Sequence, residues 1–178
     1  MNAPVDGPEA AGLSKKSIAS IAADVRQKLN YSSSEDMVHV IEKLGGRIER
    51  YDVYEAPEEG VSGTIIVEKE NDFCIKLPSQ SSPNRATFTL AHELGHYVLH
   101  FLFPLQCLMK PMARLVAYRY GGSPAESEAN YFAACFLMPE SEFRGKHLEF
   151  EGSLTRLAKH FGVATNTAGF RCKALSLT

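Results

Sequence analysis

Apolar and polar residues follow two different spacings along the chain, which together predict a mixture of helices and strands. Apolar residues recur at helical spacing in residues 14–29 and 34–44, and Gly45-Gly46 ends the second segment. Runs rich in β-branched and aromatic residues predict strands, the last two joined as a hairpin. The predicted strands are residues 47–54, 61–67 and 72–77. The sequence therefore predicts an α+β fold with a small, mostly antiparallel sheet.

Two further helices are predicted to begin with the same pair of residues. Ser82-Pro83 and Ser123-Pro124 each offer a capping serine followed by a proline, whose fixed φ suits the first helical position. The second of these helices should end at Met138, because Pro139 cannot continue it. Residues 101–122 carry no periodic pattern that selects helix or strand.

The two ends of the chain differ from its centre. Residues 1–13 are rich in Ala, Pro and Gly and are predicted to be a disordered tail. Residues 14–150 are predicted to form the main domain, which is long enough to bury a real core. Residues 151–178 have the pattern helix, glycine turn at Gly162, helix, which matches a helix-turn-helix in outline.

The composition is that of an ordinary globular protein, with 44% hydrophobic and 22% charged residues and a net charge of −2. Such a charge gives the whole chain no general attraction for nucleic acid. The four cysteines are scattered without a CxxC pair, which favours reduced thiols. The sequence has no apolar run long enough to span a membrane, and its N-terminus lacks a basic region followed by an apolar core. We therefore expect a cytoplasmic protein.

The residues His92-Glu93-Leu94-Gly95-His96 form an HExxH motif in a segment predicted to be helical. Four residues advance a helix by about 6 Å and turn it about 40° past a full circle, so both histidines lie on one face. Two neutral imidazoles can hold a zinc ion, and Glu93 beside them can accept a proton from water. An amphipathic helix with ordinary surface or core histidines is the alternative. The apolar neighbours of the motif, such as Ala91 and Val98, favour the metal site. Burying two histidines and a glutamate among them is costly unless the three side chains have a role there.

A second motif downstream can complete the site. A zinc site with two histidines needs a third protein ligand and an open position for water, and the Glu126 carboxylate can be that ligand. Asn130 lies one turn further along the same face and can hold a ligand histidine in place from outside. Ser123 and Glu126 also have the spacing of a capping box, in which Glu126 would only bond the Ser123 backbone. Glu128 is the main rival for the ligand role.

Two stretches of the sequence carry a family resemblance when taken together: RATFTLAHELGHYVLH at 85–100 and ExxANxFAAxxLMP at 126–139. They resemble the ImmA/IrrE family of zinc metallo-endopeptidases, with a weaker likeness over residues 14–175. The resemblance implies a minimal thermolysin-like zincin core. It also implies that His92, His96 and Glu126 bind the metal, that Glu93 is catalytic, and that the target is a helix-turn-helix repressor or a comparable DNA-bound regulator.

Other residues have roles that the sequence leaves open. His100 continues the histidine row, but the drift of the helix carries it off the metal face, so we expect it to be structural or to support a ligand from outside. Gly63, Thr64 and Ile65 are a candidate edge strand that would hold the substrate backbone; an ordinary core hairpin is the alternative. Tyr118, Tyr120 and His147 are conceivable stabilisers of the oxyanion, and nothing in their spacing selects one.

The C-terminal segment has a small surplus of positive charge. Between residues 144 and 173 there are six basic residues and two acidic ones, which is the direction that DNA contact requires. The basic residues are Arg144, Lys146, Arg156, Lys159, Arg171 and Lys173. The alternative is a helical lobe that packs on the main domain or docks a protein partner, and the small size of the surplus favours this alternative.

The sequence thus predicts a zinc-dependent endopeptidase that acts on a protein regulator in the cytoplasm, although manganese or iron could occupy the same nitrogen and oxygen ligands. One alternative is a partner-binding module that sequesters a repressor or forms half of a toxin–antitoxin pair. Another is a transcription factor in which the zinc is structural, although a structural site gains nothing from Glu93.

Overall fold

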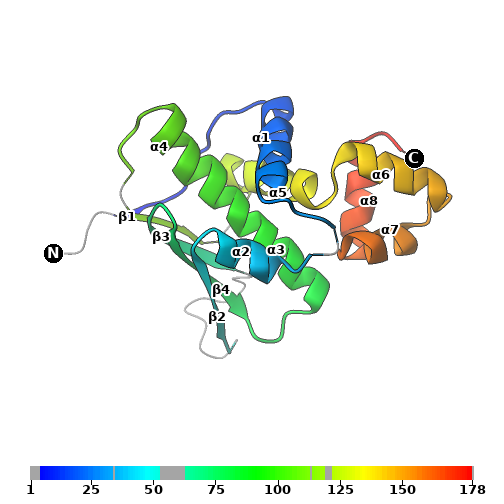
Figure 1. Ribbon diagram of the computed structural model, residues 1–178, viewed down its shortest axis with the longest axis horizontal. Coiled ribbons are helices and arrows are strands. Elements are labelled where there is room, and N and C mark those ends of the chain that lie inside the picture. Colours follow the sequence, from blue (N-terminus) through cyan, green and yellow to red (C-terminus); the bar gives the residue numbers. More distant parts are fainter. Residues whose placement is uncertain (1–4, 34, 53–62, 113, 119–121, 178) are drawn as a thin grey trace.

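Helices and strands both contribute to the fold, as the sequence predicts. The computed structural model describes residues 5–33, 35–52, 63–112, 114–118 and 122–177. Within these residues a sheet and a layer of helices make up one part of the molecule, and helices alone form a lobe at the C-terminal end (Figure 1). No helix in these ranges is both long and apolar enough to cross a membrane.

Five strands among the described residues form one sheet with the order β1-β5-β3-β4-β2. They are β1 (Val5–Asp6), β2 (Gly46–Tyr51), β3 (Thr64–Lys69), β4 (Asp72–Pro78) and β5 (Arg114–Tyr118). β3 pairs antiparallel with β4 and β5, whereas β1 is parallel to β5 and β2 is parallel to β4. The sheet is therefore mixed, with two antiparallel and two parallel pairings, rather than mostly antiparallel. The hairpin signal identifies β3 and β4, but nothing in the sequence marks the direction of strands that join from distant segments.

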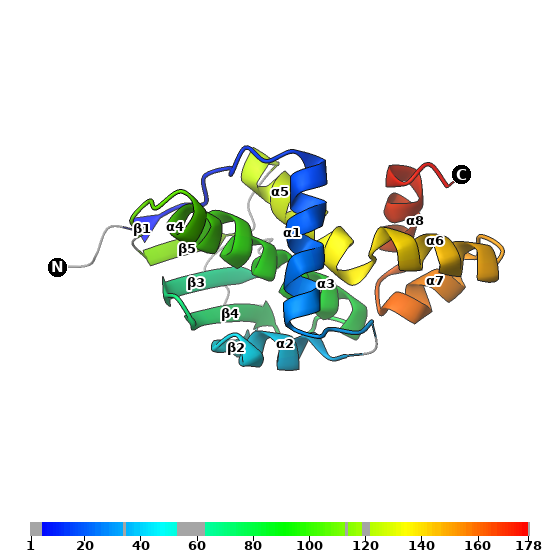
Figure 2. The ribbon, with the colours of Figure 1, turned by 45° about the horizontal axis from the view of Figure 1, so that its top comes forward.

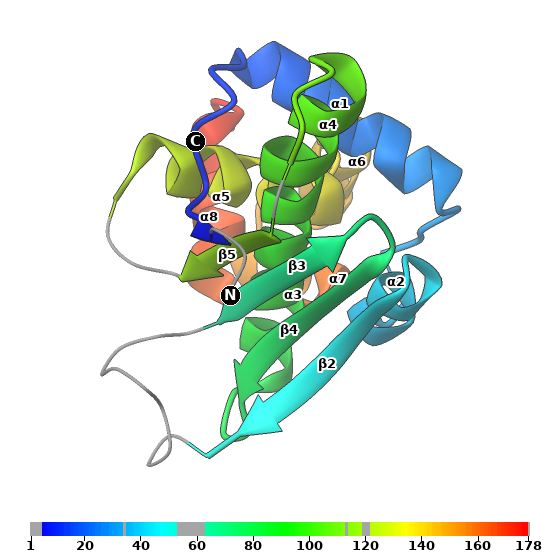
Figure 3. The same ribbon diagram turned by 90° about the vertical axis from the view of Figure 1, so that its left-hand side faces the viewer.

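The helices lie behind the sheet when the strands face the viewer (Figure 3). They are α1 (Lys15–Lys28), α2 (Met37–Lys43), α3 (Pro83–His96), η2 (Tyr97–Leu102), α4 (Phe103–Cys107), α5 (Pro124–Leu137), α6 (Glu140–Glu149), α7 (Leu154–Phe161) and α8 (Thr165–Ala174). α3 and η2 are continuous, and η2 is a π-helical turn. α5 packs between α3 and α1, so it can bring its side chains to the face of α3.

The core lies between the sheet and the helices. Ile65 and Val67 of β3 and Phe73, Ile75 and Leu77 of β4 alternate along their strands and are fully buried. Removing each such side chain from water contributes roughly 1.5–3 kcal/mol to folding. This alternation makes one face of the hairpin a rigid platform for α3.

Side chains cap the helices close to the predicted positions. Ser14 accepts a hydrogen bond from the Ser17 backbone at the start of α1. The second helix begins later than the predicted residue 34, because Asp36 caps it at Met37, and position 34 itself lies outside the described residues. The predicted strand residues 53, 54, 61 and 62 lie outside them as well.

The N-terminal segment departs from the prediction of a disordered tail over residues 1–13. Residues 1–4 lie outside the described part of the chain, but from Val5 onward the segment contacts the rest of the protein. β1 pairs with β5, and the backbone N–H groups of Ala11 and Leu13 donate to the Glu128 carboxylate at 2.8 and 3.2 Å. Amino-acid composition does not predict this order, because these contacts are made by backbone atoms of the segment, which leave no pattern in its side chains.

The C-terminal lobe consists of α6, α7 and α8 and lies at one end of the molecule, away from the sheet (Figure 2). Phe143 of α6 stacks on Phe161 of α7 with ring centroids 5.3 Å apart. Gly162, in the left-handed conformation, ends α7 and turns the chain towards α8. α6 therefore packs with the two helices that the sequence marks as a helix-turn-helix.

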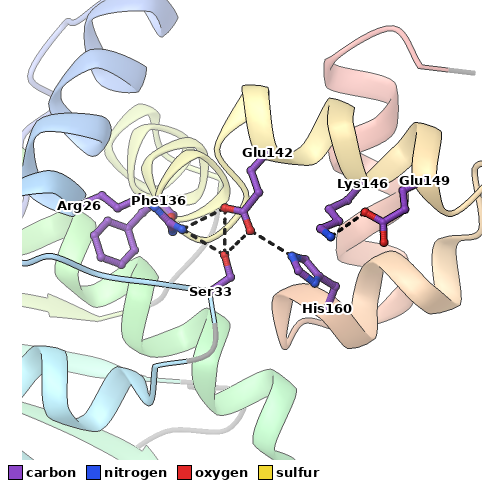
Figure 4. Close-up of polar contacts among 7 residues, drawn as sticks. All are labelled: Arg26, Ser33, Phe136, Glu142, Lys146, Glu149 and His160. Atoms are coloured by element: carbon purple, nitrogen blue, oxygen red, sulfur yellow. Dashed lines mark hydrogen bonds and ion pairs between the residues drawn. The ribbon is translucent and has the colours of Figure 1, made fainter.

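One carboxylate connects this lobe to the main part of the protein (Figure 4). Glu142 of α6 accepts hydrogen bonds from Arg26 of α1 at 3.1 Å and from the Ser33 hydroxyl at 3.0 Å, and it pairs with His160 of α7 at 3.0 Å. Arg26 also donates to the backbone carbonyl of Phe136 at the end of α5, 2.7 Å away. Glu142 thus holds three separate segments in one arrangement.

We expect Glu142→Ala to lower the free energy of unfolding by about 1–2 kcal/mol, because it removes several charge-assisted hydrogen bonds that solvent screens only in part. Glu140→Ala on the same helix is the matched control. Its exposed pair with Arg144 has i,i+4 spacing and should contribute about 0.3–0.5 kcal/mol. Urea denaturation followed by circular dichroism measures both. Equal losses in the two variants would contradict this role of Glu142.

Candidate metal centre

The two histidines of the HExxH motif lie in the last turns of α3, which is held against the hairpin by buried apolar residues. His92 and His96 are both buried, with exposed fractions of 0% and 1%. Their rings meet edge to face with centroids 4.8 Å apart, and their Nε2 atoms are 3.1 Å apart. The helical spacing therefore brings both Nε2 atoms to one point inside the protein.

α5 brings Glu126 to the same point. Ser123 caps α5 by accepting a hydrogen bond from the Glu126 backbone N–H at 3.2 Å. The Glu126 carboxylate extends to the histidines, with Oε2 3.2 Å from Nε2 of His92 and Oε1 2.9 Å from Nε2 of His96. The capping spacing and the site position thus coexist, since the backbone of Glu126 makes the cap and its side chain is left for the histidines.

Gly95 lets α3 and α5 approach closely enough for this contact. A Cβ atom at Gly95 would lie 3.1 Å from both the Cα and the carbonyl oxygen of Ala129. These are backbone atoms, which can yield only if the helix moves. The glycine inside the motif is therefore a packing requirement of the site.

Hydrogen bonds on the outer sides of the two rings fix which nitrogen carries the proton. Nδ1 of His92 lies 3.0 Å from Oδ1 of Asn130, an acceptor, so Nδ1 donates and Nε2 of a neutral ring is left as a lone pair. Nδ1 of His96 lies 3.0 Å from Nδ1 of His100, whose Nε2 lies 3.0 Å from the Glu128 carboxylate. Both predicted supporting residues, Asn130 and His100, are thus in contact with the histidines from outside.

The donor set fits a metal ion. With both outer nitrogens donating, two imidazole lone pairs and a carboxylate face one another, which is a repulsive arrangement unless a cation lies among them. Within the described part of the chain, the buried Oε1 of Glu126 has no hydrogen-bond donor. His92, His96 and Glu126 could therefore hold a metal ion.

Glu93 lies fully buried in the same helix, between the two histidines in sequence. A Cβ atom at Gly63 would lie 2.7 Å from Oε1 of Glu93, so the chain entering β3 passes directly against this carboxylate. Tyr51, at the end of β2, is also close. Burial raises the pKa of its hydroxyl, and the Glu93 charge raises it further. No sequence motif marks Tyr51, because only the pairing of β2 with β4 brings it near the site.

The prediction that Gly63, Thr64 and Ile65 form an edge strand is wrong for β3. Thr64 pairs with Lys76 of β4 on one side and with Tyr118 of β5 on the other, so β3 is interior. Gly63 allows α3 of the same protein, rather than a substrate backbone, to approach closely. Of the conceivable oxyanion stabilisers, His147 lies on α6 in the C-terminal lobe, whereas the side chains of Tyr118 and Tyr120 lie outside the described residues.

The model of the IrrE N-terminal-like domain, peptidase family M78, matches residues 53–173, which is more than half of the chain. The chain belongs to this peptidase family. The resemblance to the ImmA/IrrE family that the two sequence motifs carry is thereby confirmed.

One solved structure adds support for the fold of this M78 family member. A Mycobacterium tuberculosis transcriptional regulator superposes on it with a TM-score of 0.64 and 16% sequence identity, over 89% of this chain and 46% of that chain. At this identity the likeness establishes a shared fold alone. The chain spans about half the length of that regulator. No curated protein matches this chain in sequence.

Proposed function

We propose that this chain is a zinc-dependent endopeptidase that cleaves a protein regulator in the cytoplasm, with a minimal thermolysin-like zincin core. The observation that carries the proposal is the convergence of His92, His96 and Glu126 from α3 and α5, with Glu93 buried beside them. A site that served structure alone would gain nothing from the additional carboxylate of Glu93. Membership of a peptidase family supports the same reaction class.

In this proposal His92, His96 and Glu126 hold the ion, and Asn130 keeps His92 in the tautomer that can bind it. When bound, zinc supplies the Lewis acidity that activates water and polarises the peptide carbonyl. Glu93 accepts a proton from water as the water oxygen forms its bond to the carbonyl carbon. Glu93 then donates that proton to the amine nitrogen as the C–N bond breaks, which returns the carboxylate to its starting state.

Zinc is the ion that we propose, because two imidazoles and one carboxylate are a common ligand set of catalytic zinc sites. Manganese and iron also accept nitrogen and oxygen ligands, so the ligand set by itself does not exclude them. None of the four cysteines belongs to the cluster of His92, His96 and Glu126. This favours a catalytic site over a thiolate-rich structural one.

We propose β5, rather than the interior strand β3, as the strand that holds a substrate backbone. In the described part of the sheet, β1 covers the outer edge of β5 at Arg114 and Leu115, and β5 continues to Tyr118 opposite Thr64. Thr64 adjoins Gly63, which lies against Glu93. A peptide that adds to the outer edge of β5 would therefore run towards the site.

We propose a helix-turn-helix repressor as the substrate, as the family resemblance implies, and we do not favour DNA as a partner. Arg171 is buried and donates to the Met138 carbonyl, while Arg144 and Lys146 pair with acids on their own helix. Part of the positive-charge surplus in the sequence is thus already paired within the lobe.

We place the start of this C-terminal lobe at Pro139, before α6, rather than at residue 151.

Incubating the zinc-loaded protein with helix-turn-helix repressors from the same genome, followed by intact mass spectrometry, tests the proposal. We expect one repressor to yield a discrete pair of fragments, and a zinc chelator to suppress the cleavage. Tight association with a repressor without cleavage would instead indicate a binding module, such as an antitoxin or anti-repressor. A salt-sensitive affinity for DNA would indicate a transcription factor.

A further inference from the structure

The outer side of His96 faces another imidazole, which is an unusual partner for a metal-binding histidine. Such histidines commonly donate to a carboxylate, a backbone carbonyl or water. Here Nδ1 of His96 and Nδ1 of His100 are 3.0 Å apart, and both rings are buried. One of the two nitrogens has to donate and the other has to accept, so the protonation of His100 decides which nitrogen of His96 is left for a metal.

His100 is set by Glu128. Oε2 of Glu128 lies 3.0 Å from Nε2 of His100, and a carboxylate can only accept, so Nε2 carries the proton. Neutral His100 is then an acceptor at Nδ1, and it takes the hydrogen bond from Nδ1 of His96. The remaining lone pair of His96, at Nε2, points to Glu126, 2.9 Å away.

The spacing along the helix makes this contact available. His100 follows His96 at i,i+4, the same spacing that brings His92 and His96 together, so the two rings are neighbours along the helix. The π-helical turn η2 begins at Tyr97, directly after His96, and keeps His100 within reach of the His96 ring. The two ring centroids are 5.0 Å apart. His100 is therefore placed to contact His96 rather than the metal that His96 would bind.

Glu128 is in turn anchored by the N-terminal segment. The backbone N–H groups of Ala11 and Leu13 donate to its two carboxylate oxygens at 2.8 and 3.2 Å, across more than 100 residues of sequence. The segment itself is held by the pairing of β1 with β5. With both oxygens accepting from fixed backbone groups, the carboxylate has one orientation in which Oε2 also meets His100.

We propose that Glu128 and His100 are positioning residues for His96, and that residues 7–13 are a working part of the metal centre through Ala11 and Leu13. The chain of contacts runs from the N-terminal amides through Glu128 and His100 to Nδ1 of His96. It fixes the tautomer and orientation of one metal-binding imidazole. The inference rests on the proposed function, since it assigns to these residues a role towards the same ion.

Zinc affinity, measured by competition with a chromophoric chelator, tests the chain of contacts at each step. Loss of an outer partner of a metal-binding histidine typically weakens affinity about 10- to 100-fold. We expect His100→Phe, which removes the acceptor, to fall in that range. His100→Gln offers a carbonyl oxygen to Nδ1 of His96 and should stay closer to the unmodified protein. A residue that only fills space would give the opposite order, because phenylalanine packs more like histidine.

Glu128→Gln and deletion of residues 1–13 test the two outer steps, and both should weaken zinc binding about 10-fold or more. Their matched controls are Glu149→Gln, in an exposed ion pair of the C-terminal lobe, and deletion of residues 1–4 alone. Both controls should bind zinc as the unmodified protein does. The visible spectrum of the cobalt-loaded protein should change in the test variants and not in the controls, because the orientation of one imidazole is altered.

The outcomes separate this inference from the proposed function. If the unmodified protein binds zinc and the test variants fold and bind it equally well, the positioning role is wrong while the metal centre stands. Thermal unfolding in the presence of chelator identifies any variant that fails to fold, and the remaining variants then decide. If the unmodified protein binds no zinc, the proposed metal centre itself fails.

Discussion

Replacing Glu93 with glutamine is expected to abolish nearly all peptide cleavage while leaving the metal in place. Glutamine has the same shape but cannot accept a proton, and a positioned general base contributes about 10²- to 10⁴-fold to a rate. Glu93 is not a member of the cluster formed by His92, His96 and Glu126, so the ligand set is intact in the variant. The turnover of a cleaved repressor and the zinc content of the purified protein are measured side by side.

The comparison with a matched substitution makes this prediction specific. Glu149→Gln changes an exposed glutamate of the C-terminal lobe that pairs with Lys146, and it should leave both turnover and zinc content unchanged. Equal turnover in Glu93→Gln and the unmodified protein would remove Glu93 from the mechanism. Loss of zinc together with turnover would make Glu93 a ligand rather than the base.

Replacing Glu126 with glutamine is expected to cost the protein its metal. The variant loses the only negative charge in the cluster of His92, His96 and Glu126. Zinc affinity should fall by more than the about 10- to 100-fold that loss of an outer hydrogen-bonding partner costs. Glu128, the rival acid in the sequence, should not take over, because its carboxylate is committed to His100 and to the backbone of Ala11 and Leu13.

Isothermal titration of the zinc-free protein measures this loss, and Glu149→Gln is again the control. Zinc binding by Glu126→Gln with the affinity of the unmodified protein would mean that another residue completes the ligand set. Thermal unfolding of the zinc-free variant ensures that the loss is one of ligation. Because a buried carboxylate is replaced by an amide of equal size, we expect the zinc-free fold to persist.

The local structure of the site could be predicted because its signals are local. Ser-Pro pairs start α3 and α5, and the HExxH spacing places His92 and His96 on one helix face. Of the two roles that the sequence offered for the Glu126 side chain, the carboxylate extends to His92 and His96, and only the backbone N–H of Glu126 takes part in the cap, as a donor to the Ser123 hydroxyl. Gly95 was visible in the motif, but its purpose became evident only from the backbone of Ala129 against it.

The remaining features depend on contacts between distant segments. The position of β3 inside the sheet requires β5, which lies in a stretch without periodic signal. The ordering of the N-terminal segment depends on backbone amides that meet Glu128, and amides carry no sequence identity. The π-helical turn after His96 has more residues per turn than an α-helix by only a fraction of a residue, and the spacing of apolar residues does not distinguish the two.

A crystal structure of the zinc-loaded protein, with anomalous diffraction recorded at the zinc edge, tests the account most directly. We expect one anomalous peak, about 2.0–2.2 Å from Nε2 of His92, Nε2 of His96 and a carboxylate oxygen of Glu126. Glu93 should lie beside the ion without binding it. A peak elsewhere in the protein, or a Glu126 carboxylate turned away from a zinc ion held by other residues, would contradict the account.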